Sequence, residues 1–316
     1  MATHFSPAWQ PIRTRGRLLA ALASLALGAI ALSACSATDA APTAAGAHAA
    51  PAAVARTSPP PGVVVTADVP YAGTADRQQQ LDVCAPTATG EPRPAVLLIH
   101  GGGWHSGNKS TVTATCEWLA QAGFVTFNID YRLWPAARYP AQPDDALAAL
   151  RFLRRPATVS HYEIDPNRVG VFGGSAGGNL AALLALRGDR DNRVSALVDL
   201  SGPMDLTAGA LTARQDPRLT ADETGFLNCP SLARCPSAPL ASPLLMVSAG
   251  DPPTFIGQAS VDFVPREQGD ALATALRKAG VPVTVEVTEG RRHSFGVLTP
   301  RMQKDIVSFL HAQLGS

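Results

Sequence analysis

The sequence predicts an α/β fold with a mostly parallel, eight-stranded sheet and helices on both faces. Short apolar segments of strand length recur along the chain, and helical stretches separate most of the later ones. Strands that alternate with helices are typical of a parallel sheet that helices cover on both sides. Residues 62–316, about 255 in number, are enough for one large domain of this class, so no second domain is expected.

Eight segments carry the pattern of strands and four carry that of helices. The predicted strands are Val63–Val65, Gln80–Val83, Ala95–Ile99, Phe124–Ile129, Arg168–Phe172, Ala196–Leu200, Thr254–Gln258 and Val283–Val287. The predicted helices are Thr113–Gln121, Asp144–Leu153, Leu180–Leu186 and Glu267–Lys278. In an open parallel sheet, catalytic groups are expected at the carboxyl ends of the strands.

The most informative motif is a serine between glycines where a predicted strand gives way to a predicted helix. It reads Gly173-Gly174-Ser175-Ala176-Gly177, which contains the pattern G-x-S-x-G. A serine at such a turn is held in a strained backbone geometry that presents its hydroxyl, and only glycine neighbours let strand and helix pack this closely. The pattern is short, so a plain Gly-rich turn is the alternative. The strand before it and the helix after it favour a nucleophile elbow at Ser175.

A second motif, His100-Gly101-Gly102-Gly103-Trp104, follows directly on the predicted strand Ala95–Ile99. Consecutive glycines remove side chains from the loop, so its backbone N–H groups can approach a reacting carbonyl. We therefore predict an oxyanion hole from the amides of Gly102, Gly103 and Ala176. His100 is expected to organise this loop and not to act as a base.

Several further segments join these two motifs in a resemblance to a known superfamily. The chain resembles the esterase/lipase group of α/β-hydrolases from about Leu81 onward, near the hormone-sensitive-lipase-like and feruloyl- or acetyl-esterase-like branches. The segments that carry it are His100–Trp104, Ser106–Lys109, Asp130–Leu133, Gly173–Asn179, Asp251–Thr254 and Asp262–Pro265. The resemblance implies an α/β-hydrolase fold and a serine nucleophile. The first segment also resembles that of arylformamidases, which would imply an amidase.

The catalytic base of such a serine must be a histidine, and in this fold the acid and then the histidine follow the serine along the chain. Two histidines follow Ser175. His293 lies in a loop after the last predicted strand and resembles the family's His-x-Phe loop. His311 is expected in a C-terminal helix as a surface or packing residue. We therefore predict His293 as the base.

Three aspartates compete for the role of the triad acid. Asp262 follows the predicted strand Thr254–Gln258, so its carboxylate would emerge at the catalytic edge. The segment Asp262-Phe263-Val264-Pro265 resembles the family's Asp-x-x-Val-Pro, with one residue fewer before the valine. Asp205 follows the preceding strand, where some members of the fold place the acid. Asp251 comes before the strand and would lie at its wrong end. We predict Asp262, with turn or helix-cap roles as the alternative for each.

The predicted reaction is acyl transfer from an ester to water through an acyl-enzyme on Ser175. Trp104 and Tyr131 are candidates to line the pocket, although core packing is equally compatible with them. The connection Gly202–Leu240 is expected either to flank the pocket or to pack on the surface. It contains no large amphipathic lid, so short-chain, acetyl or aryl esters are expected as substrates. A noncatalytic binding protein that keeps the fold is the alternative from another class.

The N-terminus has the composition of an export signal. Residues 1–34 contain three arginines and no acidic residue, with an apolar run over Leu18–Leu32 that is shorter than the roughly 20 residues of a membrane-spanning helix. The ending Leu32-Ser33-Ala34-Cys35 resembles a bacterial lipobox, which implies cleavage before Cys35 and lipidation of its thiol. A plain secretory signal is the alternative. Residues 35–61, mostly Ala, Pro, Thr and Ser, are predicted to be a disordered tether.

Four further cysteines lie beyond the tether, and cysteines in an exported domain suggest disulfides. Cys229 and Cys235 share one loop, which favours a local bridge. Cys84 and Cys116 would then form the second pair by exclusion. Buried free thiols are the alternative, and no Cys-x-x-Cys or His cluster suggests a metal site.

Charge and motifs limit the expected partners. Without Arg13, Arg15 and Arg17, the 26 basic and 25 acidic residues become 23 and 25, so the mature chain is near neutral. A near-neutral chain without a basic stripe is not expected to bind nucleic acid. No dinucleotide or P-loop pattern is present, so no cofactor or metal is implied. The expected partner is a small ester, with a membrane contacted only through the lipid at Cys35.

Overall fold

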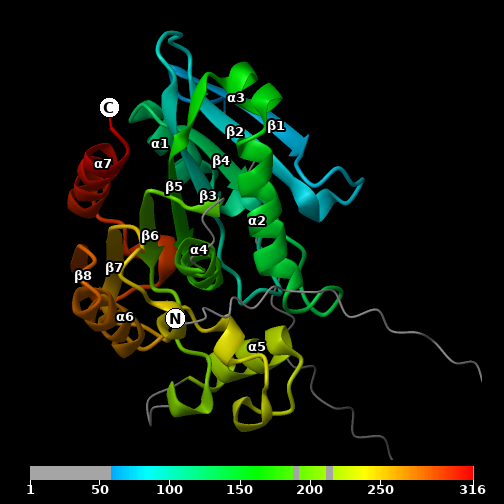
Figure 1. The fold of residues 1–316 in the computed structure, drawn as a ribbon, viewed down its shortest axis with the longest axis vertical. Coiled ribbons are helices and arrows are strands. Elements are labelled where there is room, and N and C mark those ends of the chain that lie inside the picture. The colour runs from blue at the N-terminus through cyan, green and yellow to red at the C-terminus, as the bar shows by residue number, and fades with distance from the viewer. Residues whose placement is uncertain (1–57, 188–191, 211–215, 316) are drawn as a thin grey trace, which may run out of the picture. The chain divides into compact units, whose positions relative to one another are not determined.

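The computed structural model describes residues 58–187, 192–210 and 216–315. The predicted signal, Cys35 and most of the predicted tether lie outside the described residues. One eight-stranded sheet runs through the described chain in the order β1-β2-β4-β3-β5-β6-β7-β8 (Figure 1). Its strands are β1 (Val63–Pro70), β2 (Gln80–Pro86), β3 (Arg93–Ile99), β4 (Val125–Ile129), β5 (Ile164–Gly174), β6 (Ala196–Leu200), β7 (Thr254–Val261) and β8 (Val283–Arg291).

The sheet is mostly parallel, which confirms the predicted fold class. β1 pairs antiparallel with β2 and β2 antiparallel with β4, whereas every later pair is parallel. All eight predicted strands are present, and several extend beyond their apolar runs. β5 continues through Gly174, so it ends directly at Ser175. The carboxyl ends of β3 and β5–β8 therefore share one edge of the sheet.

The helices of the described chain are α1 (Thr113–Gln121), α2 (Ala141–Leu153), α3 (Pro156–Tyr162), α4 (Ala176–Leu186), α5 (Pro217–Leu227), α6 (Glu267–Lys278) and α7 (Pro300–Leu314). The bounds predicted for α1 and α6 are confirmed. The helices α3 and α5 were not predicted. Each begins with a proline in its first turn, and the Asp216 side chain caps α5 by accepting a hydrogen bond from the Arg218 N–H. Those start signals were present in the sequence. Among the described helices, none is long and apolar enough to cross a membrane.

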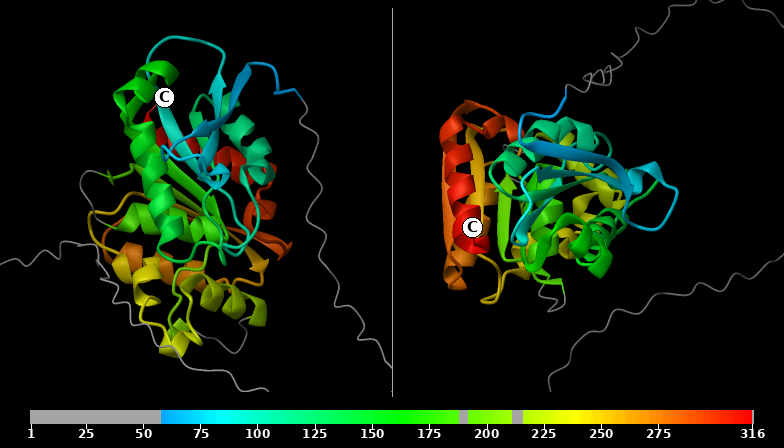
Figure 2. Two further views of the ribbon diagram at one scale, coloured as in Figure 1. Left: turned by 90° about the vertical axis from the view of Figure 1, so that its right-hand side faces the viewer. Right: turned by 90° about the horizontal axis from the view of Figure 1, so that it is seen from above.

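Alternating side chains along the strands build two cores, one on each face of the sheet. Figure 2 shows the helices that cover these faces. In β3, Leu97 and Ile99 pack in the core that α2, α4 and α6 cover. Val96 and Leu98 point to the opposite face and pack with residues of α1 and α7. Both faces are dry, because the side chains of Val96, Leu97, Leu98 and Ile99 are fully buried. This two-sided burial explains why the central strands read as continuous apolar runs.

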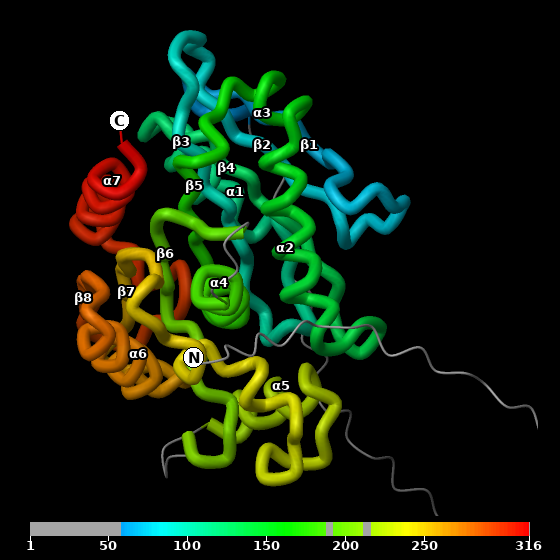
Figure 3. Tube along the Cα trace, viewed as in Figure 1, coloured from blue at the N-terminus to red at the C-terminus, as the bar shows by residue number. Residues whose placement is uncertain are grey.

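The chain between β6 and β7 leaves the sheet and forms α5 together with several short 3₁₀ turns (Figure 3). This segment packs on loops that follow other strands. The Tyr139 N–H donates to the Phe226 carbonyl at 3.0 Å, and the rings of Phe226 and Trp104 stack at 4.4 Å. The segment therefore covers part of the sheet edge where the carboxyl ends of the strands meet.

Two disulfides are present, and both predicted pairings are confirmed. Cys84–Cys116 joins β2 to α1, across 32 positions of the sequence. Cys229–Cys235 closes a short loop after α5. The first bond links the antiparallel edge of the sheet to the helix that covers it.

Candidate active site

Ser175 occupies the turn between β5 and α4 with backbone angles φ 56° and ψ −127°, a region that non-glycine residues rarely adopt. Its N–H donates to the Leu200 carbonyl at 2.8 Å, which ties the turn to the end of β6. The neighbouring glycines are required sterically. A Cβ at Gly173 would collide with the Gly177 carbonyl, and a Cβ at Gly177 would collide with the carbonyl oxygens of Ile99 and His100. The predicted elbow is thus a close contact between β3, β5 and α4.

The glycine loop after β3 adopts backbone angles that explain its composition. Gly102 has φ 122° and Gly103 has φ 59°, and a side chain at Gly102 would collide with the Ser106 carbonyl. The Gly102 carbonyl accepts hydrogen bonds from both the N–H and the hydroxyl of Ser106 at 2.9 Å. The Ala176 N–H opens α4, where the first amides have no acceptor within the helix. All three predicted oxyanion amides therefore belong to segments that meet at the elbow.

Two aromatic residues support this loop from the core. The rings of Tyr131 and His100 stack at 4.4 Å, and the Tyr131 hydroxyl donates to the His100 carbonyl at 3.1 Å. Trp104 and Tyr131 are both 1% exposed, so the contacts shown for these two candidate pocket residues are packing contacts. Burial lowers the pKa of His100 to about 4, and this side chain stays neutral at physiological pH. His100 therefore organises the loop, as expected.

An ion-pair network holds the far end of the same loop. Lys109 Nζ lies 2.6 Å from a carboxylate oxygen of Asp68 and 3.1 Å from one of Asp82, and the Lys109 N–H donates to Asp130 at 2.6 Å. Burial lowers the pKa of Lys109, but the bonds to Asp68 and Asp82 more than offset this and raise it above its ordinary value. Burial also raises the pKa of Asp130 to about 6. The loop is thus fixed to β1, β2 and the end of β4.

The structure brings Asp262 and His293 together. Asp262 follows β7 directly and His293 lies just beyond β8. His293 Nδ1 donates to Asp262 Oδ1 at 2.8 Å, and the Val264 N–H reaches the same oxygen at 3.2 Å. The Asp262 side chain is 2% exposed and that of His293 is 25% exposed. The aspartate is therefore buried behind a histidine whose other face remains accessible.

The competing residues are engaged elsewhere. Asp205 Oδ1 accepts a hydrogen bond from the Thr207 N–H at 2.9 Å, and Asp251 accepts bonds from the N–H and hydroxyl of Ser248. Both aspartates therefore stabilise local turns. His311 donates from Nε2 to the Ala122 carbonyl at 3.0 Å and packs on Phe124, which is the packing role expected for it.

The histidine loop also packs against the elbow. A Cβ built at Gly174 would collide with Ser294 Oγ and with the ring of Phe295, the two residues that follow His293. One built at Gly101 would lie 3.1 Å from Ser175 Cβ and 3.5 Å from Ser294 Oγ. Ser175, the glycine loop and the His293 loop therefore share one small region at the carboxyl edge of the sheet.

Sequence reasoning missed the residues that α5 contributes to this region. Asp222 lies 3.1 Å from His105 Nε2, and its carboxylate occupies the space that a side chain at Gly103 would need. The Arg218 guanidinium lies 5.6 Å from the centre of the Phe263 ring, which itself packs at 4.2 Å on the His293 ring. The capping signal at Asp216 could have revealed the helix, but nothing in the sequence shows that it reaches these loops.

The α/β-hydrolases share one arrangement of these groups. In it, a serine lies at the turn after the fifth strand of the sheet, close to an aspartate and a histidine that follow later strands. Here these are Ser175 after β5, Asp262 after β7 and His293 after β8. The chain has the fold of that class. Residues 81–276 match the family model BD-FAE, which is more than half of the chain, and the chain belongs to that family.

Curated relatives are named as esterases. The chain is 29% identical to Esterase LipQ of Mycobacterium tuberculosis over 77% of this chain and 61% of that protein. It is 33% identical to an ethyl acetate hydrolase of Pseudomonas putida over 64% of this chain and 65% of that protein. The chain thus spans less than two thirds of the length of either relative.

Solved structures show the same architecture. A thermophilic esterase from Thermogutta terrifontis superposes with a TM-score of 0.63 at 26% identity, over 81% of this chain and 93% of that one. A truncated carbohydrate esterase from gut microbiota gives a TM-score of 0.66 at 24% identity, over 80% of this chain and 97% of that one. The second likeness is one of fold alone.

The contact at Gly177 leads to a prediction about stability. Gly177→Ala is expected to lower the free energy of unfolding by about 3 kcal/mol, because the new methyl group overlaps two backbone carbonyls that cannot move without shifting β3. Gly209→Ala is the matched control, since its new Cβ would meet only Thr207 Oγ1, at 3.6 Å. Urea denaturation at constant pH measures both, and equal stability of the two variants would contradict the tight elbow.

Proposed function

We propose that the protein is a serine carboxylic-ester hydrolase that acts through an acyl-enzyme. The observation that carries this proposal is the 2.8 Å hydrogen bond between Asp262 and His293, in a loop that packs on the strained turn of Ser175. Nucleophile, acid and base (Ser175, Asp262 and His293) follow each other along the chain in the order of this fold. The relatives named as esterases support the same reaction.

Each group has a defined part in the proposed reaction. His293 takes the proton of Ser175 as the serine oxygen attacks the ester carbonyl. The N–H groups of Gly102, Gly103 and Ala176 stabilise the oxyanion, aided by the positive end of the α4 dipole. Asp262 orients His293 and stabilises its positive charge. The alcohol leaves with a proton from His293, and a water activated by the same histidine releases the acid.

Short acyl or aryl esters are the proposed substrates. α5 and its neighbouring turns cover part of the catalytic edge, and α5 presents charged side chains there, those of Asp222 and Arg218. Long alkyl chains gain nothing from charged surroundings, whereas small polar esters are compatible with them. The relative named ethyl acetate hydrolase supports the same size class.

We also propose that the protein is exported and anchored by a lipid on Cys35. The two disulfides support export, because such bonds persist in oxidising compartments. The composition of residues 1–34 supports a signal that precedes the lipidated cysteine.

The nucleophile is tested by Ser175→Ala. This variant is expected to keep the wild-type unfolding midpoint and to lose ester hydrolysis by about 10⁴-fold or more, because no other group can form the acyl-enzyme. p-Nitrophenyl esters from acetate to laurate measure turnover, with the highest kcat/KM expected at the short end. Ser195→Ala, at the opposite end of β6, is the control. Unchanged turnover in Ser175→Ala would overturn the mechanism.

The acid is tested by a set of matched aspartate variants. Asp262→Asn is expected to lower kcat by about 10³- to 10⁴-fold, since an amide can stabilise neither the correct tautomer nor the charge of His293. Asp205→Asn and Asp251→Asn are expected to stay within about twofold of the wild type, because each only stabilises a turn. Steady-state kinetics decides between them, and a larger loss in Asp205→Asn would move the acid to β6.

The anchor is tested in a bacterial host. Cys35→Ala is expected to move the full chain from the membrane fraction to the soluble fraction, because the thiol that would carry the lipid is lost. Immunoblots of separated fractions measure the shift, with metabolic labelling by a fatty acid as a second readout. A wild-type chain that takes up no label would leave a plain secretory signal as the explanation.

A further inference from the structure

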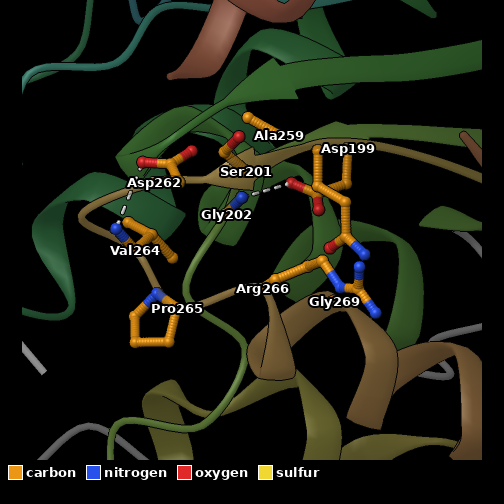
Figure 4. Close-up of a pocket in the computed structure, with 10 residues that line it drawn as sticks. Asp199, Ser201, Gly202, Ala259, Asp262, Val264, Pro265, Arg266 and Gly269 are labelled. Atoms are coloured by element: carbon orange, nitrogen blue, oxygen red, sulfur yellow. Dashed lines mark hydrogen bonds between the residues drawn. The ribbon is translucent and has the colours of Figure 1, made fainter. Parts of the chain in front are cut away.

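Three buried oxygen atoms at the carboxyl edge of the sheet have no hydrogen-bond partner among the described residues. They are Asp199 Oδ2, Ser201 Oγ and Asp262 Oδ2. Asp199 lies in β6 and is fully buried, and Ser201, just beyond the strand, is 6% exposed. Unpaired buried oxygens are rare in folded proteins and each requires an explanation. The three residues moreover line one cavity (Figure 4).

The cavity is small, and polar side chains contribute to its lining. Its volume is about 10 Å³, the size of a site for about one water molecule. In the view of Figure 4, Ser201 is drawn between the carboxyl groups of Asp199 and Asp262. The backbone holds Ser201 firmly, since its N–H donates to the Gly257 carbonyl of β7 at 3.0 Å and its φ is 57°. The site is therefore built, and Asp262 belongs to its lining whereas His293 does not.

We propose that Asp199 and Ser201 are positioning residues that hold Asp262 from behind, through hydrogen bonds to its Oδ2 made across this cavity directly or by one bound water. The inference rests on the proposed function, because Asp262 is the acid of that mechanism. Asp262 Oδ1 already accepts from His293 and Val264. Donors on Oδ2 would fix the second oxygen and so set the orientation of the carboxylate and of the histidine.

Asp199 can donate only if it is protonated, and its surroundings favour that state. Burial raises the pKa of Asp199 to about 8, a rise that the Gly202 N–H opposes and the charge of Asp262 reinforces. Oδ1 accepts from the Gly202 N–H at 3.0 Å, which leaves Oδ2 to carry the proton toward the cavity. A neutral Asp199 can thus donate to Ser201 or to a water, and Ser201 to Asp262.

The other groups around the cavity do not provide a cation that would favour an ionised Asp199. From α4, Gly178 packs its backbone on Asp199 Oδ1. Among the described residues that line the cavity, Arg266 is the one charged side chain besides the two aspartates. Its guanidinium is paired with Asp270 of α6 at 3.0 Å, and Asp270 also accepts from the Gln258 side chain at 2.7 Å. The cation is therefore already engaged by another carboxylate.

The test compares Asp199→Asn, Asp199→Ala and Ser201→Ala with the wild type, using kcat and KM for p-nitrophenyl acetate from about pH 6 to about pH 10. Asp199→Ala and Ser201→Ala are expected to lose about tenfold to 100-fold in kcat with KM nearly unchanged, since each interrupts the chain of donors that ends on the charged Asp262. Asp199→Asn keeps a neutral donor and is expected to stay within about threefold of the wild type near pH 7.

The pH profile separates a positioning role from a purely structural one. Wild-type kcat is expected to fall as Asp199 ionises near pH 8, because a second negative charge then faces Asp262. That fall should be absent in Asp199→Asn and retained in Asp251→Asn, the control at the other end of β7. Wild-type kcat in Asp199→Ala, or loss in Asp199→Asn equal to that in Asp199→Ala, would overturn the proposal. Should Asp199→Ala fail to fold, the comparison of kcat above about pH 8 between the wild type and Asp199→Asn tests the proposal, and an equal fall in both would overturn it.

A stability readout keeps this test independent of catalysis. The folded-state pKa of Asp199 lies above its unfolded value, so the wild type loses stability as pH rises from about 4 to about 8, whereas Asp199→Asn does not. Urea midpoints should therefore diverge in favour of Asp199→Asn over that range. Parallel midpoints would overturn the neutral state of Asp199. A wild type without turnover, alongside diverging midpoints, would instead contradict the proposed ester hydrolysis and leave the neutral Asp199 standing.

Discussion

The structure depends on one backbone contact, the close approach of β3, β5 and α4 at the turn of Ser175. Gly173 and Gly177 allow it, because a methyl group at either position would overlap a backbone carbonyl. The contact places the start of α4 against the end of β3, from which the glycine loop emerges. Ser175 and the predicted oxyanion amides are thus positioned by the same packing, and neither can shift without the other.

Charged groups lie on several sides of this contact. Lys109 and its carboxylate partners lie at one end of the glycine loop and fix it to the antiparallel edge of the sheet. Asp262 and His293 come from β7 and β8 on the other side of the elbow. α5 reaches both regions through Asp222 beside His105 and Arg218 above Phe263. The excursion between β6 and β7 therefore contacts both the glycine loop and the residues beside His293.

The parts of the fold and of the candidate site that the sequence predicts are those that depend on short, local sequence patterns. Strands such as Ala95–Ile99, the elbow at Ser175 and the chain order of the triad candidates depend on short patterns, and the structure places Asp262 beside His293 as expected. The helix α5 was missed although Asp216 and Pro217 form a start signal, because the Pro-rich surroundings obscured it. Contacts such as His105 with Asp222 join residues far apart in sequence, and no local pattern encodes them.

Asp199 and Asp262 show how surroundings divide the roles of two like groups. Both are buried aspartates at the carboxyl ends of neighbouring strands, and two ionised carboxylates around one small buried cavity would repel each other strongly. Asp262 accepts a hydrogen bond from His293, which becomes a cation in the proposed reaction. Asp199 accepts a hydrogen bond from the Gly202 backbone N–H, and its burial favours the neutral acid. Through Ser201 or a bound water, the proton on Asp199 then supports a hydrogen bond to Asp262, so the neutral carboxyl group begins the chain of donors that the charged one requires.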